Sequence, residues 1–236
     1  ITAQNVHGND GMGDIGLPLH GRIPKDGNAA EALIAAANSH VGELTLVTLG
    51  PLTNIADALN RDPTLSKKVG RCVVMGAAAD HIGNGTPGAA FNMWCDPHAV
   101  EIVLASGMKL EFVGWDISRH FAAISPARAR AIRAIGTALA EFSIDIQRKV
   151  AEFCAEVTHI DGFDLPDPIA MAYAIDGNIA TEIRDLYLTV ETRSAHTLGM
   201  VVMDTLGVLR QPPNARVVTR ADSELFMTML TTAIRV

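Results

Sequence analysis

The hydrophobic positions of the chain alternate between short continuous apolar runs and runs with helical spacing, which predicts strands alternating with helices. Buried-type strands are expected at residues 43–49, 72–75 and 108–115. Helices, most of them opened by a capping side chain or a proline, are expected at 28–40, 53–60, 96–106, 125–156 (broken near Gly136) and 167–174. This alternation implies parallel strands joined by right-handed crossovers.

The pattern changes at both ends of the chain. Two strands facing each other as a hairpin, a further strand and a closing helix are expected at 182–192, 198–204, 216–219 and from 222 onward. Residues 1–28 hold several glycines and few periodic apolar positions, so they are expected to be loop. The fold class is therefore α/β: a single domain over 1–236 with an open, mostly parallel sheet, a mixed edge and helices on both faces. Because such a domain normally begins with a strand, its amino-terminal βα units are expected to be missing.

The composition of the 236-residue chain fits this fold and excludes some classes of binding partner. The chain is 48% hydrophobic with two tryptophans and two tyrosines, and an aliphatic core of this kind suits a parallel sheet beneath helices. The net charge is −7 and no basic stripe occurs, which argues against nucleic acid as a partner. No apolar run of about 18 residues occurs, so no membrane partner is expected. Cys72, Cys95 and Cys154 lie far apart, which fits neither a zinc site nor a disulfide framework and indicates a cytoplasmic protein.

Small residues gather in the long loop after strand 72–75, and such loops at the carboxyl ends of parallel strands bind ligands in open α/β proteins. Its segment 83–88 matches G-x-G-x-x-G. A dinucleotide fingerprint requires those glycines directly between strand and helix, whereas seven residues separate Met75 from Gly83 and Pro87 interrupts the turn. We therefore expect the loop to carry Asn92 over the strand ends rather than to bind a dinucleotide.

Three aspartates lie where strands end or helices begin. Capping explains Asp96 fully, because Asp-Pro opens a helix there. Asp116 follows a strand and either closes a turn or points into a cleft, and for Asp167 a cap and a role in the cleft stay equally open. If the strands are parallel neighbours, Leu49, Met75 and Asp116 lie on one rim.

The ordered set of motifs resembles the inosine-uridine preferring nucleoside hydrolase family. The matching pieces are Val6-His7-Gly8 to Gly13, Leu46 to Ala56 (LVTLGPLTNIA), Val73 to Gly76, Gly83-Asn84 through Phe91-Asn92 to Asp96-Pro97, Gly114-Trp115-Asp116, and Asp167 to Ala170. Their order and spacing run through the whole chain. The resemblance implies a Rossmann-like nucleoside hydrolase fold. It also implies an enzyme of purine or pyrimidine salvage that hydrolyses the N-glycosidic bond of a ribonucleoside to ribose and free base.

The resemblance further implies one Ca²⁺ at the bottom of the cleft. The backbone carbonyl of Leu49 and the carboxylate of Asp167 match two of the family's metal ligands. Ca²⁺ takes about six to eight oxygen ligands, so it can hold sugar hydroxyls and a water together. It would lower the pKa of that water, a carboxylate would take the proton, and the transition state would resemble an oxocarbenium ion.

The same resemblance assigns the substrate contacts. Met75, Asn84 and Asn92 match family positions that contact the ribose, and His7 matches a histidine near the base. The expected partner is a nucleoside or a ribose-like small molecule, and a homodimer or homotetramer is expected.

Three departures from the family pattern bear on the chemistry. The family's D-x-D-x-x-x-D-D motif occurs nowhere in the chain, so the general base is expected in a missing amino-terminal segment. Ala90 stands where the family commonly has a sugar-binding glutamate, and Pro166 stands where many members have a histidine that protonates the leaving base. The candidates to replace that histidine are His159, Asp161 and Asp164 of the same loop, and departure of the base by another route is the alternative; the choice among these stays open. The alternative to an enzyme is therefore a catalytically inactive ligand-binding or assembly member of the same fold.

Overall fold

The computed structural model describes residues 1–18 and 26–236, which contacts between α-carbons divide into two compact units. The described residues of the first unit are 1–18, 118–165 and 223–236, and the second unit comprises 26–117 and 166–222. Each unit is described by itself. The single domain expected from the sequence stays a prediction.

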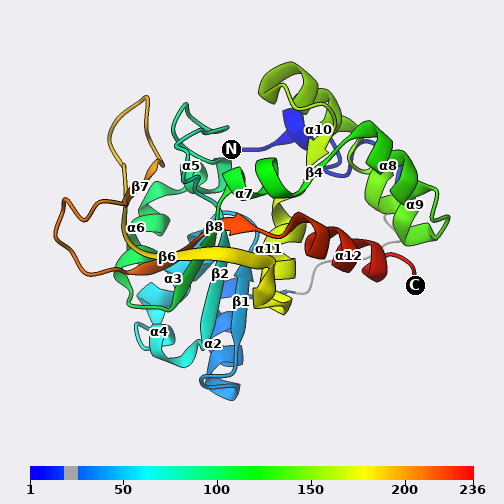
Figure 1. Ribbon diagram of the computed structural model, residues 1–236. Coiled ribbons are helices and arrows are strands. Elements are labelled where there is room, and N and C mark those ends of the chain that lie inside the picture. Colours follow the sequence, from blue (N-terminus) through cyan, green and yellow to red (C-terminus); the bar gives the residue numbers. More distant parts are fainter. Residues whose placement is uncertain (19–25) are drawn as a thin grey trace. The chain divides into compact units, whose positions relative to one another are not determined.

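The second unit is built on a six-stranded sheet with the order β1-β2-β3-β8-β6-β7 (Figure 1). The strands are β1 (Thr45–Thr48), β2 (Arg71–Met75), β3 (Leu110–Val113), β6 (Ala180–Val190), β7 (Val201–Asp204) and β8 (Ala215–Ala221). The first four in this order pair in parallel, whereas β6 pairs antiparallel with both β8 and β7. This arrangement confirms the mostly parallel sheet with a mixed edge and the predicted hairpin.

The helices of the second unit cover both faces of this sheet. They are α2 (Ala29–Ser39), α3 (Thr53–Arg61), α4 (Leu65–Lys68), α5 (Phe91–Cys95), α6 (Pro97–Ala105), α11 (Pro166–Ile175) and the 3₁₀ turn Gly177–Ile179. Cys72 and Val74 of β2 share one apolar cluster with side chains of α2, α3 and α6. Alternate strand residues point to the opposite face, where α11 packs against β1 and β2.

Two of the predicted helix starts show the expected caps. The Asn28 side chain accepts hydrogen bonds from the amides of Ala30 and Glu31 at the start of α2. Asp96 accepts a hydrogen bond from the amide of Ala99 at 3.0 Å and another from the Thr53 hydroxyl at 2.6 Å. The cap of α6 therefore also fixes the first residue of α3.

Two boundaries near the long loop were predicted wrongly. The strand expected at 108–115 ends at Val113, and Trp115 begins α7 (Trp115–Phe121). The turn falls at Gly114, where a β-carbon would lie 2.1 Å from a carboxylate oxygen of Asp116. Phe91 and Asn92 do not lie in loop but open the short helix α5.

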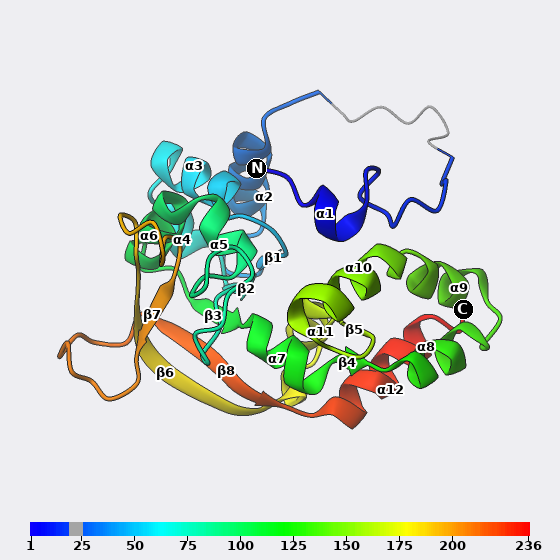
Figure 2. The same ribbon diagram turned by 90° about the horizontal axis from the view of Figure 1, so that it is seen from above.

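The first unit is mainly helical (Figure 2). Its elements are α1 (Gln4–His7), the remainder of α7, β4 (Ala123–Ile124), α8 (Pro126–Arg133), α9 (Ala138–Asp145), α10 (Arg148–Phe153), a π-helix (Cys154–Thr158), β5 (Phe163–Asp164) and α12 (Ser223–Ala233). The long helix predicted for 125–156 breaks at Gly136, as expected, and again at Gln147. Residues 1–28 were expected to be loop, but α1 interrupts the described part, and residues 19–25 lie outside the described residues. The loop expected at 159–168 contains β5 and ends where α11 begins at Pro166.

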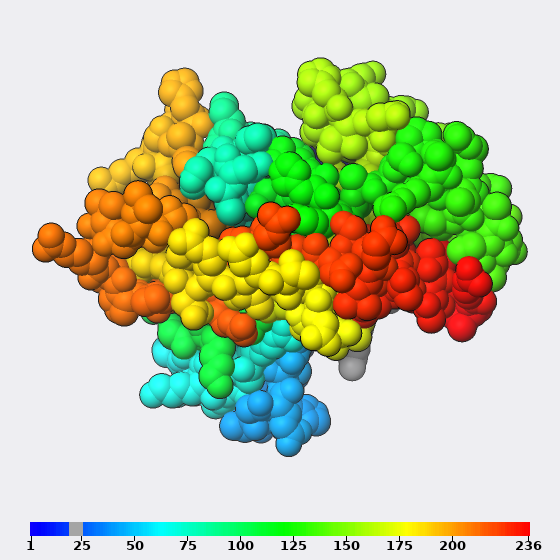
Figure 3. All heavy atoms as spheres, viewed as in Figure 1, coloured from blue at the N-terminus to red at the C-terminus, as the bar shows by residue number. Residues whose placement is uncertain are grey.

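The connection between β7 and β8 is a loop that projects from the second unit's sheet (orange in Figure 3). Its apolar side chains Leu206 and Val208 are 87% and 73% exposed. They add nothing to the core, so substitutions there are expected to leave folding intact.

Candidate functional site

The carboxyl ends of β1, β2 and β3 meet on one edge of the sheet. Thr48 is paired with Val74, and Met75 with Val113, so the residues that leave these strands lie side by side. The rim of Leu49, Met75 and Asp116 that the sequence predicts is therefore present in the second unit.

Asn92 bridges the ends of β1 and β2. Its amide nitrogen lies 3.4 Å from the carbonyl oxygen of Leu49, 3.2 Å from that of Met75 and 3.3 Å from the Met75 sulfur. Within the described parts of the chain, no donor reaches the Asn92 side-chain oxygen. Because that oxygen has two lone pairs, it is available to accept hydrogen bonds from a ligand's hydroxyl groups.

Asn84 fixes the loop that leads to α5. Its side-chain oxygen accepts a hydrogen bond from the Phe91 amide at 2.7 Å. Between these residues the chain folds into a compact turn, in which the amides of Asn84, Gly85 and Thr86 all point to the carbonyl of Ala89. Backbone donors used in this way cannot cradle a phosphate, which agrees with the rejection of the dinucleotide fingerprint.

The orientation of α11 brings Asp167 toward the same edge. Arg71, at the beginning of β2, donates hydrogen bonds to the carbonyls of Tyr173 and Ala174 in the last turn of α11. A ten-residue helix is about 15 Å long and a five-residue strand about 16 Å. The first turn of α11, which holds Asp167, therefore reaches the carboxyl ends of the strands.

Asp167 is a half-buried carboxylate near the start of α11. Burial raises its pKa to about 6. Within the described part of the chain, no hydrogen bond or ion pair reaches its side chain. Burying an unpaired carboxylate is unfavourable, and a bound cation would offset that cost.

The oxygen atoms of Asp167 and Leu49 are of the type that Ca²⁺ binds, but they are too few to hold the ion alone. The Asp167 carboxylate and the Leu49 carbonyl are hard oxygen ligands of the type that Ca²⁺ prefers, but about six to eight are needed. No group of three or more His, Cys, Asp or Glu side chains that could hold a metal gathers among the residues that the structure describes. Asp167 and Leu49 alone could therefore supply only part of the ligand set that Ca²⁺ needs.

Ala90 and Pro166, the two departures from the family pattern, both have structural roles. Ala90 is buried and precedes α5, where its carbonyl accepts hydrogen bonds from the amides of Met93 and Trp94. Pro166 occupies the first position of α11, which suits proline because no backbone donor is needed there.

His7 lies in the first unit, at the end of α1. It is exposed to solvent, yet desolvation by the protein around it lowers the pKa of its imidazole, which favours the neutral form of the ring. The glycine-rich loop that follows is held by Arg148, which donates hydrogen bonds to the carbonyls of Gly13 and Asp14 at 3.0 Å.

The candidate leaving-group acids also belong to the first unit. Asp164 is buried, and it accepts hydrogen bonds from the Ser118 hydroxyl at 2.5 Å and from the Cys154 thiol at 4.0 Å. It is therefore occupied in holding β5 in place. His159 has a left-handed backbone (φ +57°) after the π-helix, and Asp161 is exposed.

Sequence reasoning missed the buried charge network that anchors α11. Glu111, in the middle of β3, bonds to Arg71 at 2.8 Å, to Arg216 at 3.1 Å and to the Tyr173 hydroxyl at 2.6 Å. Burial acts to raise the pKa of Glu111, but the hydrogen bonds from Arg71 and Tyr173 and the charges of the two arginines outweigh it and lower the pKa. The available signal was a lone glutamate in a buried-type strand, between Leu110 and Phe112.

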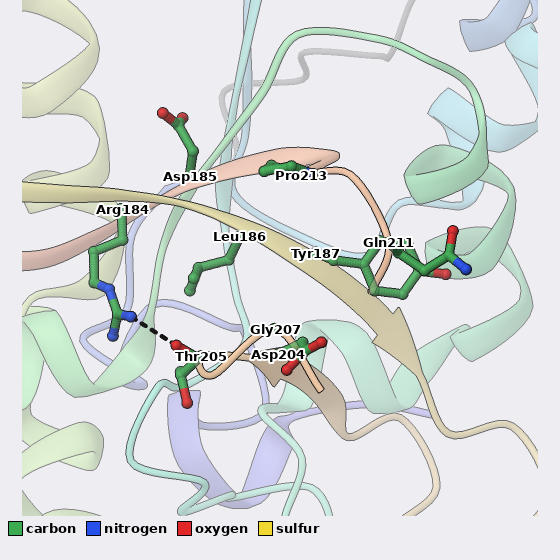
Figure 4. Close-up of a pocket in the computed structure, with 9 residues that line it drawn as sticks. All are labelled: Arg184, Asp185, Leu186, Tyr187, Asp204, Thr205, Gly207, Gln211 and Pro213. Atoms are coloured by element: carbon green, nitrogen blue, oxygen red, sulfur yellow. Dashed lines mark hydrogen bonds between the residues drawn. The ribbon is translucent and has the colours of Figure 1, made fainter. Parts of the chain in front are cut away.

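A hollow of about 480 Å³ lies elsewhere in the second unit, between β6 and the connection after β7 (Figure 4). The guanidinium of Arg184 reaches the carbonyl of Thr205 across it, at 2.9 Å. None of the residues predicted for the site lines this hollow.

Comparison with known proteins agrees with this geometry. Residues 1–228 match the model of the family described as inosine-uridine preferring nucleoside hydrolase. The pyrimidine-specific ribonucleoside hydrolase RihA of Salmonella gallinarum is 35% identical over 231 residues, which cover 98% of this chain and 73% of that protein. RihA of Salmonella typhimurium is 34% identical with the same coverage.

Solved structures are similar over almost the whole chain. A plant nucleoside hydrolase, PpNRh1, superposes with a TM-score of 0.91 at 28% identity and covers 100% of this chain and 75% of its own. The purine-preferring ribonucleoside hydrolase of Gardnerella vaginalis gives 0.86 at 26% identity, with 98% and 73% covered. These similarities confirm the predicted Rossmann-like fold and the enzyme class. The chain belongs to the inosine-uridine preferring nucleoside hydrolase family.

Proposed function

We propose that this protein hydrolyses the N-glycosidic bond of ribonucleosides to ribose and free base. The observation that carries the proposal is Asn92, whose amide spans the ends of β1 and β2 and leaves its oxygen available for a ligand. A ribose offers several hydroxyl groups to such an acceptor. The site lies at the carboxyl ends of parallel strands, where open α/β proteins bind their ligands.

Asn92, Asn84 and Met75 position the sugar in this proposal. Asn92 accepts from ribose hydroxyls, and the turn held by Asn84 covers the sugar. Fixed contacts of this kind raise the rate when they are stronger to the oxocarbenium-like transition state than to the ground state. Positioning also removes the entropic cost of aligning the sugar with a water molecule.

Asp167 and the Leu49 carbonyl would hold Ca²⁺, together with the carboxylates of the acidic motif that the family carries upstream of the segment matching His7. When bound, the ion supplies a water of lowered pKa and orients the sugar hydroxyls. The carboxylate of Asp167 supports this proposal, because it is half-buried, has a raised pKa and is unpaired among the described residues. The general base is proposed to lie in that acidic motif.

His7 is proposed to contact the base as a neutral imidazole, since desolvation lowers its pKa. His159 and Asp161 remain the candidates for protonating the leaving base. Asp164 is less suited because its oxygens already accept hydrogen bonds from Ser118 and Cys154.

The direct test is ribose release from purine and pyrimidine nucleosides, each with and without a calcium chelator. Both base classes belong in the assay, because RihA is named pyrimidine-specific and the Gardnerella enzyme purine-preferring. The chain is assayed alone and joined to an amino-terminal D-x-D-x-x-x-D-D segment. Chelator-sensitive release by the extended chain is expected, and no release from any nucleoside would rule the proposal out.

A second candidate is a non-catalytic member that binds a nucleoside or ribose without turnover. The absence of a three-ligand metal cluster among the described residues favours it, as do Ala90 and Pro166. Calorimetry with ribose and uridine separates the two functions: binding without ribose release identifies the non-catalytic protein.

The proposed setting is a homodimer or homotetramer in the cytoplasm. The free cysteines Cys72, Cys95 and Cys154 support this setting, because thiols stay reduced in the cytoplasm. Among the described residues, no helix has the length and apolar character needed to cross a bilayer. Light scattering in solution tests the assembly, and a monomer would contradict it.

A further inference from the structure

Asp116 is a buried carboxylate that the proposed mechanism does not use. It lies in the first turn of α7, directly after β3, and is 7% exposed. One of its oxygens accepts a hydrogen bond at 3.2 Å from the amide of Ala79, in the loop after β2. Asp116 thus joins the segment that follows one strand to the segment that follows its neighbour.

Three hydrogen bonds in succession fix the beginning of the loop after β2 to the end of β3. The Gly76 amide bonds to the carbonyl of Val113, the Trp115 amide to the carbonyl of Ala77, and the Ala79 amide to Asp116. The last of these is the only one of the three made by a side chain. It is therefore the one that a substitution can remove without changing the backbone.

The backbone at this point is strained. Ala77 is buried and has φ +65°, a left-handed conformation that alanine adopts only at a cost of about 1–3 kcal/mol. Such a conformation persists where the surroundings determine it fully. Ala77 lies between the bonds made by Gly76 and Ala79, and the loop continues from there to Asn84 and Asn92.

We propose that Asp116 is a positioning residue for the sugar site, because it holds the beginning of the loop that carries Asn84 and Asn92. This inference rests on the proposed function, in which those asparagines contact ribose. The Asp116 carboxylate touches the loop backbone and takes no part in the chemical step. Without the Asp116 carboxylate a smaller fraction of the molecules has the loop in its binding conformation. The apparent affinity for the nucleoside falls in proportion to that fraction.

The test compares Asp116→Ala, which removes the acceptor, with Asp116→Asn, which keeps an oxygen for the Ala79 amide. We expect Asp116→Ala to raise KM for the nucleoside about tenfold with little change in kcat. This is the effect of a tenfold fall in the population of molecules whose loop is in the binding conformation. Asp116→Asn is expected to stay within about twofold of the parent KM, since its oxygen preserves the competent population. The matched control is Asp80→Asn, an exposed acidic residue of the same loop.

Hydrogen exchange of the amides in 76–92 is the second readout, and it does not depend on activity. Faster exchange in Asp116→Ala, but not in Asp116→Asn or Asp80→Asn, supports the proposal even if no nucleoside is hydrolysed. Unchanged exchange and KM in a folded Asp116→Ala protein would overturn it, as would a lower kcat at unchanged KM. If Asp116→Ala does not fold, Asp116→Glu replaces it, because it keeps the charge but moves the acceptor by one methylene.

Discussion

At the scale of single residues, the sequence motifs predicted which residues gather at the strand ends, but not the buried contacts that hold the surrounding elements in place. Leu49, Met75 and Asn92 converge as predicted, because strand ends of a parallel sheet share one edge. Glu111 could not be assigned a role beforehand, since its partners lie 40 to 105 residues away in the sequence. Motifs report local chemistry, whereas buried charge pairs form only in the folded chain.

Asn92→Ala is expected to lower kcat/KM for nucleoside hydrolysis by about 10–100-fold, because a ligand hydrogen bond and the bridge between β1 and β2 contribute about 1–3 kcal/mol. Steady-state ribose release measures the change. Asn60→Ala is the matched control, an exposed asparagine at the end of α3 that should leave kcat/KM unchanged. Equal activity of both variants would show that Asn92 does not contact the substrate.

At the scale of elements, strand and helix positions followed the hydrophobic pattern, and the errors arose where backbone geometry decides. The turn at Gly114 depends on a close approach to Asp116 that no periodicity reveals. The hydrophobic pattern also could not predict that β8 lies between β3 and β6, because strand order depends on pairing between distant segments. The orientation of α11, and with it the position of Asp167, rests on Arg71 and Glu111 at the opposite edge of the sheet.

Glu111→Gln is expected to lower the free energy of unfolding by about 3–5 kcal/mol, because it leaves the partly buried Arg71 without its anion. Urea titration followed by circular dichroism measures the loss. Glu101→Gln, at an exposed position on α6, should change the free energy by less than about 0.5 kcal/mol. A loss no larger than that of the control would show that the network does not anchor α11.

The same glutamate makes stability depend on pH. Because the folded protein lowers the pKa of Glu111 below its ordinary value of 4.5, the unfolded chain binds the proton more readily. The stabilisation is therefore present above about pH 4.5 and is lost as the pH falls through the lower, folded pKa. Thermal unfolding measured from pH 7 to pH 3 should show a shallower acid-side decline for Glu111→Gln than for the parent, and parallel curves would contradict this.

At the scale of the whole molecule, the fold class was predictable because alternating strands and helices admit few topologies. The division into two units was not predicted, since no linker marks it in the sequence. The first unit holds His7 and the candidate leaving-group acids, and the second holds the residues proposed to contact the sugar.

Calcium is expected to stabilise the 236-residue chain only slightly, because no group of three or more metal-binding side chains gathers among the described residues and the proposed ligands there are only the Asp167 carboxylate and the Leu49 carbonyl. A site with a dissociation constant near 1 mM would add about 0.4 kcal/mol at 1 mM Ca²⁺. Thermal unfolding with 1 mM CaCl₂ and with chelator should therefore differ by little. A large increase in Tm at 1 mM CaCl₂ would show that the chain binds the ion tightly by itself.

The most direct test of the account is ribose release from uridine and inosine by the extended, acidic-motif form, compared between Asp167→Asn and Asp176→Asn. The two aspartates lie at opposite ends of α11, and Asp176 only caps the following turn, where it accepts a hydrogen bond from the Asn178 amide. The account predicts at least about a 100-fold loss of ribose release for Asp167→Asn, about 2.7 kcal/mol in the barrier, and parent activity for Asp176→Asn. Undiminished release by a folded Asp167→Asn protein would contradict it.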